Sequence, residues 1–161
     1  MSQSPTLGVL LRRLLEHLDG AVEEAYATAG LDYRPRYTPV VLALREQGPS
    51  PIRAIAERTG VSHSATSQTV SQMTRQGLVK LKAGDDGRER IVELTAASKR
   101  LLPQLEQHWA ATAKAAKSLE KDIATPLAAV LSDALSALER KSFASRIHEA
   151  QSSATKVRKS R

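Results

Sequence analysis

The sequence predicts a mainly helical protein with one small β-hairpin, an α+β fold class. Three observations lead to this prediction. Apolar residues recur three or four positions apart near the N-terminus, the pattern changes to alternation after Gly77, and leucines recur at helical spacing again from Leu127. With 161 residues, of which 41% are hydrophobic, the chain is long enough to bury a core.

The N-terminal apolar pattern predicts an amphipathic helix over residues 7–29 that ends near Gly30. Its apolar stripe is wider than one small domain needs. Further along, Thr38 is expected to be the N-cap of a second helix, with Pro39 at the first helical position. This helix is expected to end near Gly48.

Two short helices follow. Ser50 and Pro51 predict the start of the first, which stops at Gly60. Ser62 is expected to cap the second, which ends near Gly77. This close spacing is typical of a helix-turn-helix.

A hairpin is predicted next. Val79 and Leu81 alternate with lysines, and Val92 and Leu94 flank a glutamate, which indicates two strands. The turn-rich residues 84–87 lie between them as the tip.

The rest of the chain is predicted to be helical up to a basic tail. Thr95 is expected to cap a long helix in which Pro103 can produce a kink. A last helix is expected over residues 126–147. The composition of residues 151–161, a polar segment with basic side chains and no acid, predicts disorder.

The charge distribution indicates a polyanionic partner. The net charge is +7, and no Asp or Glu occurs between Arg58 and Gly84. Carboxylates would repel phosphates, so their absence suits a surface that contacts nucleic acid. The small number of aromatic residues argues against a single-strand binder that stacks bases.

Other classes are disfavoured by what the sequence lacks. The absence of cysteine excludes disulfides and thiolate zinc sites. No apolar run has the length of a membrane span, and the early arginines follow the apolar stretch instead of preceding it, so a cytoplasmic protein without a membrane partner is expected. No catalytic motif or phosphate-binding loop is evident, which predicts that the chain is not an enzyme.

The second short helix has two distinct faces. At helical spacing, Thr66, Thr69, Val70 and Met73 form the inner side, and short polar groups with an arginine form the outer side. Glutamine can pair with adenine and serine can contact bases or phosphates, although an ordinary solvated face would look similar. The candidate DNA contacts from this region are Arg53, Ser62, His63, Ser64, Ser67, Gln68, Ser71, Gln72 and Arg75.

The hairpin supplies further candidates. An arginine at its tip could enter a narrow minor groove, and Asp86 could hold the loop in shape. The acids at the tip offset these cations, so a solvated hairpin is the alternative. The candidate DNA contacts here are Lys80, Lys82, Arg88 and Arg90.

Three segments of the chain resemble the multiple-antibiotic-resistance regulator (MarR) family. They are residues 52–62, the stretch that leads to Val79, and residues 86–95, which match the wing pattern of Asp-x-Arg followed by a hydrophobic position before Leu-Thr. The resemblance implies a winged helix-turn-helix. The sequence departs from the family at Gln68, where many relatives have arginine, and at Ser98, where glycine is usual; little effect is expected from the second.

The resemblance also implies a domain layout and a homodimer. One domain would span residues 1–150, with a winged core at about 36–95 and N- and C-terminal dimerisation helices at about 5–29 and 96–150. The apolar stripes of the terminal helices agree, because a small winged domain cannot cover them; a monomer whose terminal helices pack on each other is the alternative. A twofold dimer would read a pseudo-palindromic DNA site.

Relatives often bind small aromatic or anionic effectors, so the resemblance implies a possible ligand site. Buried tyrosine and tryptophan side chains or phosphate-contacting arginines would explain the same residues. Four separated histidines do not form a ligand set, and no metal or cofactor is expected. The candidate effector residues are His17, Tyr33, Arg34, Arg36, Tyr37 and Trp109.

The function predicted is a sequence-specific regulator of transcription that binds double-stranded DNA. A repressor is favoured over an activator because occupying a promoter requires no polymerase contact, and a small ligand would release it. A sequence-tolerant architectural protein and a protein-interaction module with a winged-helix fold are the alternatives.

Overall fold

The computed structural model describes residues 4–84 and 89–159, with side chains described up to residue 152. Its backbone divides into two compact units, Met1–Thr112 and Ala113–Arg161. The elements in chain order are α1 Leu7–Thr28, the 3-10 helix η1 Pro35–Tyr37, α2 Thr38–Gln47, β1 Ser50–Pro51, α3 Ile52–Thr59, α4 His63–Arg75, β2 Val79–Ala83, β3 Arg90–Leu94, α5 Ala96–Lys121, α6 Leu127–Arg140 and α7 Phe143–Lys159.

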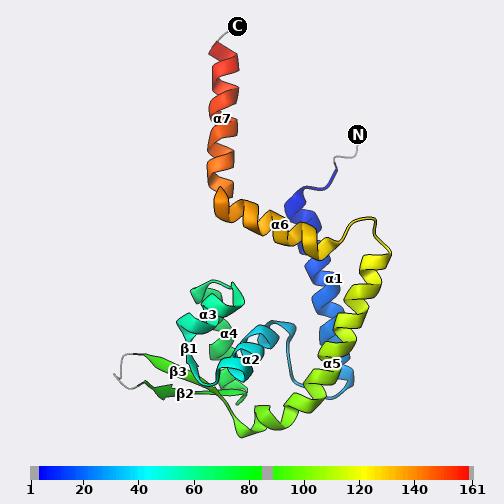
Figure 1. The fold of residues 1–161 in the computed structure, drawn as a ribbon, viewed down its shortest axis with the longest axis vertical. Coiled ribbons are helices and arrows are strands. Elements are labelled where there is room, and N and C mark those ends of the chain that lie inside the picture. The colour runs from blue at the N-terminus through cyan, green and yellow to red at the C-terminus, as the bar shows by residue number, and fades with distance from the viewer. Residues whose placement is uncertain (1–3, 85–88, 160–161) are drawn as a thin grey trace. The chain divides into compact units, whose positions relative to one another are not determined.

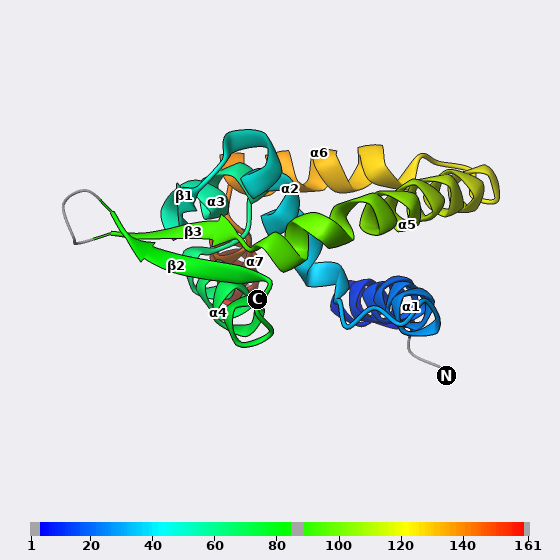
Figure 2. The same cartoon turned by 90° about the horizontal axis from the view of Figure 1, so that it is seen from below.

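The first unit contains the predicted hairpin within a small sheet. Among the described residues the strand order is β1-β3-β2, and both pairs are antiparallel. Val79 lies opposite Leu94 and Leu81 opposite Val92, so the apolar positions of the hairpin share one face. Figure 1 shows α2, α3 and α4 gathered beside this sheet, and Figure 2 shows β2 and β3 extending beyond them. The predicted α+β class is confirmed.

The core of this unit lies where α2, α3, α4 and the sheet meet. Ile55 and Met73 are completely buried, and Val92 from β3 is buried with them. Each such side chain contributes about 1.5–3 kcal/mol relative to an exposed one. The other buried hydrophobic residues in the cluster are Tyr26, Leu31, Tyr33, Tyr37, Val40, Val41, Ala43, Leu44, Val70, Leu78, Val79, Leu94 and Leu105.

Two predicted helix caps were wrong. Thr38 is the first residue of α2, not its N-cap, because the 3-10 helix before it already carries the chain in a helical direction. Ser50 does not cap α3; it pairs with Val92 as part of β1, and its hydroxyl donates to the carbonyl of Gly48 at 3.0 Å. The sequence therefore did not predict β1, because a strand of two residues is too short to show an alternating pattern.

Thr95 caps α5 as predicted, and Ser98 has a larger role than expected. The Thr95 Oγ1 accepts from the backbone N–H of Ser98 at 3.2 Å and donates to the carbonyl of Gly77 at 2.7 Å. The buried Ser98 hydroxyl donates to the carbonyl of Leu78. Serine at this position thus joins the start of α5 to the residue directly before β2, a link that the side chain of glycine could not make. Pro103 lies inside α5, and Figure 1 shows this helix changing direction early along its length.

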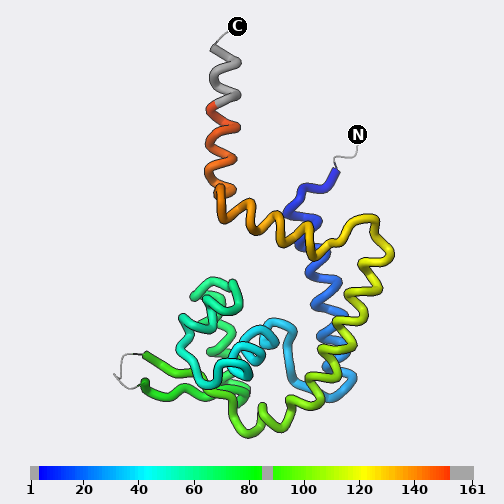
Figure 3. The backbone as a smooth tube through the Cα atoms, viewed as in Figure 1, coloured from blue at the N-terminus to red at the C-terminus, as the bar shows by residue number. Residues whose placement is uncertain are grey.

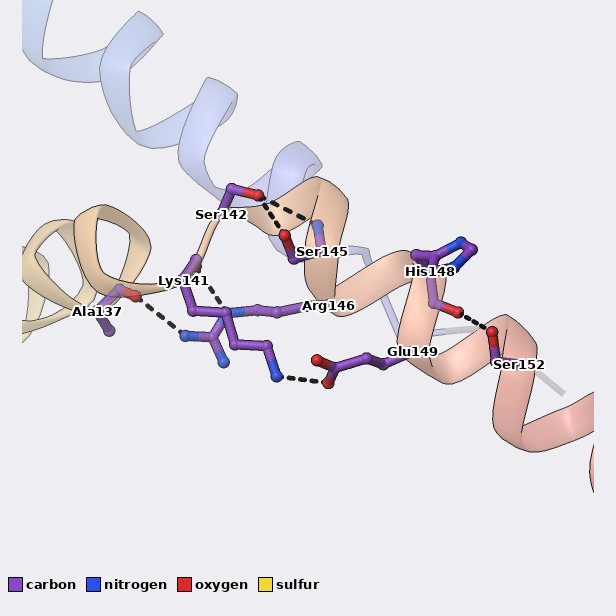
Figure 4. Close-up of polar contacts among 8 residues, drawn as sticks. All are labelled: Ala137, Lys141, Ser142, Ser145, Arg146, His148, Glu149 and Ser152. Atoms are coloured by element: carbon purple, nitrogen blue, oxygen red, sulfur yellow. Dashed lines mark hydrogen bonds and ion pairs between the residues drawn. The ribbon is translucent and has the colours of Figure 1, made fainter.

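The second unit differs from the single helix predicted over residues 126–147. Lys141 has an extended backbone that ends α6, and Ser142 begins α7 by accepting from the N–H of Ser145 at 3.2 Å. Figure 3 shows the change of direction, and Figure 4 shows Arg146 donating to the carbonyl of Ala137 at 3.0 Å. The backbone of α7 continues to Lys159, so the segment 151–161 predicted to be disordered is helical over most of its length.

Candidate nucleic-acid interface

A glycine turn separates α3 from α4 and positions α4. Gly60 ends α3 in the left-handed conformation, with φ of 67°, which a residue without a Cβ adopts at no steric cost. The hydroxyl of Ser62 then accepts from the N–H of Ala65 at 3.3 Å, as predicted for an N-cap. Two helices joined by so short a turn form the helix-turn-helix.

The inner face of α4 packs as predicted. Thr66, Val70 and Met73 are buried, and Thr69 is half-buried. Their burial fixes the orientation of the helix, because a rotation would bring polar side chains into the core.

The outer face of α4 is polar and carries no acid. Ser64, Gln68, Ser71 and Arg75 are exposed, and Ser67 is half-buried. Hydroxyl and amide groups can donate to and accept from base edges, and an arginine can contact a phosphate. The structure therefore brings these five predicted DNA contacts together on one helix face.

The predicted contacts that flank this face are also accessible. Ser62 and His63 are exposed at the start of α4. Arg53 is exposed on α3, where its Nε lies 3.0 Å from Glu57 Oε1, four residues further along the helix. An ion pair this exposed is weak, so a phosphate could replace the glutamate.

The lysines of the hairpin share one acidic partner. Lys80 Nζ and Lys82 Nζ lie 3.5 and 2.5 Å from the same carboxylate oxygen of Glu93. The side chain of Glu93 is only 18% exposed, and the adjacent Lys82 ammonium lowers the pKa of its carboxyl. Sequence reasoning missed this pairing, although the hairpin register places Lys80 directly opposite Glu93.

The hairpin tip itself lies outside the described residues. This is the position of Asp86 and Arg88, for which a wing role was predicted. Arg90, the first residue of β3, is exposed.

Gln72 differs from the other predicted contacts on α4. It is half-buried, and its side-chain carbonyl accepts from Arg36 Nη2 at 2.5 Å. One turn later, Gln76 Nε2 donates to both carboxylate oxygens of Asp32 at 3.2 Å. These contacts join α4 to the segment between α1 and α2 and could not be found from local sequence patterns.

Two of the predicted effector residues lie in the core. Tyr33 and Tyr37 are buried and meet edge to face at 5.6 Å, and burial raises the pKa of Tyr33. Tyr26, which was not a candidate, joins them through a contact of 5.1 Å with Tyr33. This cluster forms part of the core, in agreement with the alternative considered for Tyr37.

Of the remaining effector candidates, Arg36 lies beside the Tyr37 ring and Trp109 packs against the core. His17 and Arg34 are exposed, and Arg36 is held by Gln72. Trp109 is half-buried on α5, where the guanidinium of Arg45 lies 5.9 Å from its ring centroid.

Neither a metal site nor a membrane span is found in the described part of the chain. Its residues contain no group of three or more His, Cys, Asp or Glu side chains that could hold a metal ion. No helix within 4–84 or 89–159 has both the length and the apolar character needed to cross a membrane.

These elements define a winged helix-turn-helix: a short-turn helix pair followed by a hairpin. Residues 30–89 match the model of the MarR family, which confirms the resemblance for this segment of the chain. No curated protein matches the chain.

Solved structures of transcriptional regulators share the fold over most of the chain. PcaV of Streptomyces coelicolor, in complex with its natural ligand, has a TM-score of 0.64 and 21% identity, covering 88% of this chain and 99% of its own. MOSR of M. tuberculosis, in complex with DNA, has a TM-score of 0.66 and 21% identity, with coverages of 84% and 96%. Wild-type MarR from E. coli has a TM-score of 0.54 and 17% identity, with coverages of 84% and 98%.

Proposed function

We propose that the chain is a sequence-specific, double-stranded DNA-binding regulator of transcription that inserts α4 into the major groove. The observation that carries the proposal is the exposed, acid-free face of α4 opposite a buried face. The N-terminal residues of a recognition helix contact base edges, and Ser64 and Gln68 occupy such positions. MOSR, a protein of the same fold, has been solved in complex with DNA, which supports DNA binding by this fold.

Gln68 is the side chain best suited to base recognition. Its amide can donate to and accept from adenine at once, and a good bidentate pair of this kind discriminates by about 1–3 kcal/mol. Gln68→Ala should therefore relax the preference at one base position in a selection of bound genomic fragments. Gln104→Ala, on the exposed surface of α5, removes the same amide elsewhere and serves as the control.

The result for Gln68 decides whether the exposed face of α4 recognises bases. An unchanged base preference in Gln68→Ala, measured at the same salt concentration as the wild type, would contradict the proposal. Binding that is steeply salt-dependent but equally tight on all sequences would favour an architectural protein instead.

The protein is also proposed to act as a homodimer. Large hydrophobic side chains are exposed on α1 and α6, including Leu15 at 58% and Leu135 at 63%. Soluble proteins rarely leave such stripes exposed, and a second copy would cover both. A twofold dimer would place two α4 helices about one turn of DNA apart, on a pseudo-palindromic site.

Charge placed on these stripes tests the dimer. Leu15→Glu combined with Leu135→Glu should reduce the mass measured by light scattering to that of one chain. Ser132→Glu, at an exposed polar position of α6, adds the same charge and should leave the mass unchanged. A double variant that still has twice the mass of one chain would exclude these stripes as the dimer interface.

We also propose that the protein represses transcription and that a small molecule releases it from DNA. Occupying a promoter blocks polymerase without any further contact, which favours repression, and PcaV of the same fold has been solved with its natural ligand. Small aromatic carboxylates should lower the affinity for the operator in an anisotropy titration. If a broad panel of such compounds leaves the affinity for DNA unchanged, release by a ligand is refuted. The DNA-binding proposal is not affected by that result.

A further inference from the structure

The connection between α1 and α2 holds α4 at two points. Arg36 Nη2 donates to Gln72 Oε1 at 2.5 Å, and Gln76 Nε2 donates to both oxygens of the Asp32 carboxylate at 3.2 Å. The two glutamines are four residues apart, so they lie above one another on the same side of the helical segment. The C-terminal part of α4 is thus attached along a line parallel to its axis.

The connection is itself anchored in the core. The guanidinium of Arg36 lies 5.9 Å from the centroid of the Tyr37 ring, which is 1% exposed. Tyr37 meets Tyr33 edge to face, and Tyr33 meets Tyr26 of α1 in the same way. A polar contact that starts from fixed aromatic rings can hold its partner in a defined position.

The attachment lies beside the face proposed to read DNA. Gln72 follows Gln68 by one helical turn, and the two positions differ by about 40° around the helix at 100° per residue. A side-chain tip about 5–6 Å from the helix axis moves by roughly 2 Å when the helix rotates by about 20°. Such a shift exceeds the tolerance of a hydrogen bond. The rotation of α4 therefore controls whether Gln68 can meet a base.

We propose that Arg36 and Asp32 are positioning residues that act through Gln72 and Gln76 to fix the rotation of α4 in the groove. The proposal rests on the DNA-binding function proposed for α4. It assigns Gln72 to holding the helix rather than to contacting a base. It also assigns Arg36 to Gln72 rather than to a phosphate.

A double-mutant cycle tests the first contact. Arg36→Met, Gln72→Met and the double variant are titrated by fluorescence anisotropy against the selected site and an unrelated duplex over a range of salt. Each single variant should weaken specific binding by about five- to tenfold, the size expected for one typical intramolecular hydrogen bond, and the double variant should be no weaker than either. Non-specific affinity should stay within about twofold of the wild type, since a residue that acts through Gln72 makes no phosphate contact.

The salt dependence separates positioning from direct contact. If Arg36 contacts a phosphate, the slope of log affinity against log salt in Arg36→Met falls by about 0.9. That result, or losses that simply add in the double variant, would overturn the proposal. A wild-type protein that fails to bind any duplex would overturn the proposed function as well, whereas wild-type binding with unaffected variants would overturn the positioning role alone.

Asp32 provides a matched pair of variants. Asp32→Asn and Asp32→Leu remove the same negative charge, but only asparagine keeps an oxygen that can accept from Gln76. The asparagine variant should retain most of the specificity, and the leucine variant should lose about as much as Arg36→Met. An equal loss of specificity in the two would show that Asp32 acts only through its charge, and wild-type specificity in both would show that its contact is not needed; either result would overturn its positioning role. Thermal unfolding of every variant checks that the fold is intact.

Discussion

Thr66→Val should stabilise the protein without changing its DNA contacts. Thr66 lies on the inner face of α4 and is 2% exposed, and its hydroxyl has no hydrogen-bond partner among the described residues. Burying a hydroxyl without a partner costs about 1–3 kcal/mol in protein mutational data. Valine has the same branched shape and replaces the hydroxyl with a methyl group, so the cost is removed and the packing is kept.

The expected gain can be measured by thermal unfolding. We expect a stabilisation of about 1–2 kcal/mol, and for a chain of this length each kcal/mol raises Tm by about 2–4 °C, so the shift is about 2–8 °C. Protein concentration must be the same in all samples because the proposed dimerisation would make Tm depend on it. Thr66→Ser keeps the hydroxyl and loses a methyl, and should destabilise the fold by about 1 kcal/mol.

The two variants together test the orientation of α4. A fall in Tm for Thr66→Val, or equal Tm values for the valine and serine variants, would refute the reasoning, because it would mean that the hydroxyl is satisfied in the folded protein. The affinity for DNA should be unchanged in Thr66→Val, since no side chain of the outer face has been altered.

Two further predictions concern the hairpin and the tyrosine cluster. Glu93→Gln should raise the non-specific affinity for DNA, because it releases Lys80 and Lys82 from their shared carboxylate. The slope of log affinity against log salt should steepen by up to about 0.9 for each phosphate that these lysines contact. An unchanged slope would show that they do not contact phosphates. Burial raises the pKa of Tyr33 above its ordinary value, so its contribution to stability is complete below about pH 10, the ordinary pKa of tyrosine, and is lost as the pH rises towards the folded value. Tyr33→Phe should therefore remove part of the loss of stability in alkaline urea titrations, and a pH profile identical to that of the wild type would contradict this.

The faces of α4 were predictable because they follow from local periodicity. A helix places residues at 66, 70 and 73 on one side, so the spacing of Thr66, Val70 and Met73 in the sequence is enough to assign them to the interior. The cap at Ser62 and the turn at Gly60 could be identified in the same way, since each depends on the preference of one residue for one backbone conformation.

Features that depend on distant pairing were not predictable. The strand β1 exists only because Ser50 and Pro51 meet β3, about 40 positions further along the chain. The contact of Gln76 with Asp32 spans 44 positions and leaves no local pattern. The break between α6 and α7 was different, because a capping serine at 142 was present in the sequence and was overlooked.

The central claim is that a pair of α4 helices reads two half-sites in the major groove. Selection of bound sites from genomic fragments at a fixed salt concentration tests it most directly. We predict enriched sites with twofold symmetry whose half-sites are about 10–10.5 base pairs apart. Selected fragments that share no symmetric sequence, or that are no more enriched than random DNA, would contradict the claim.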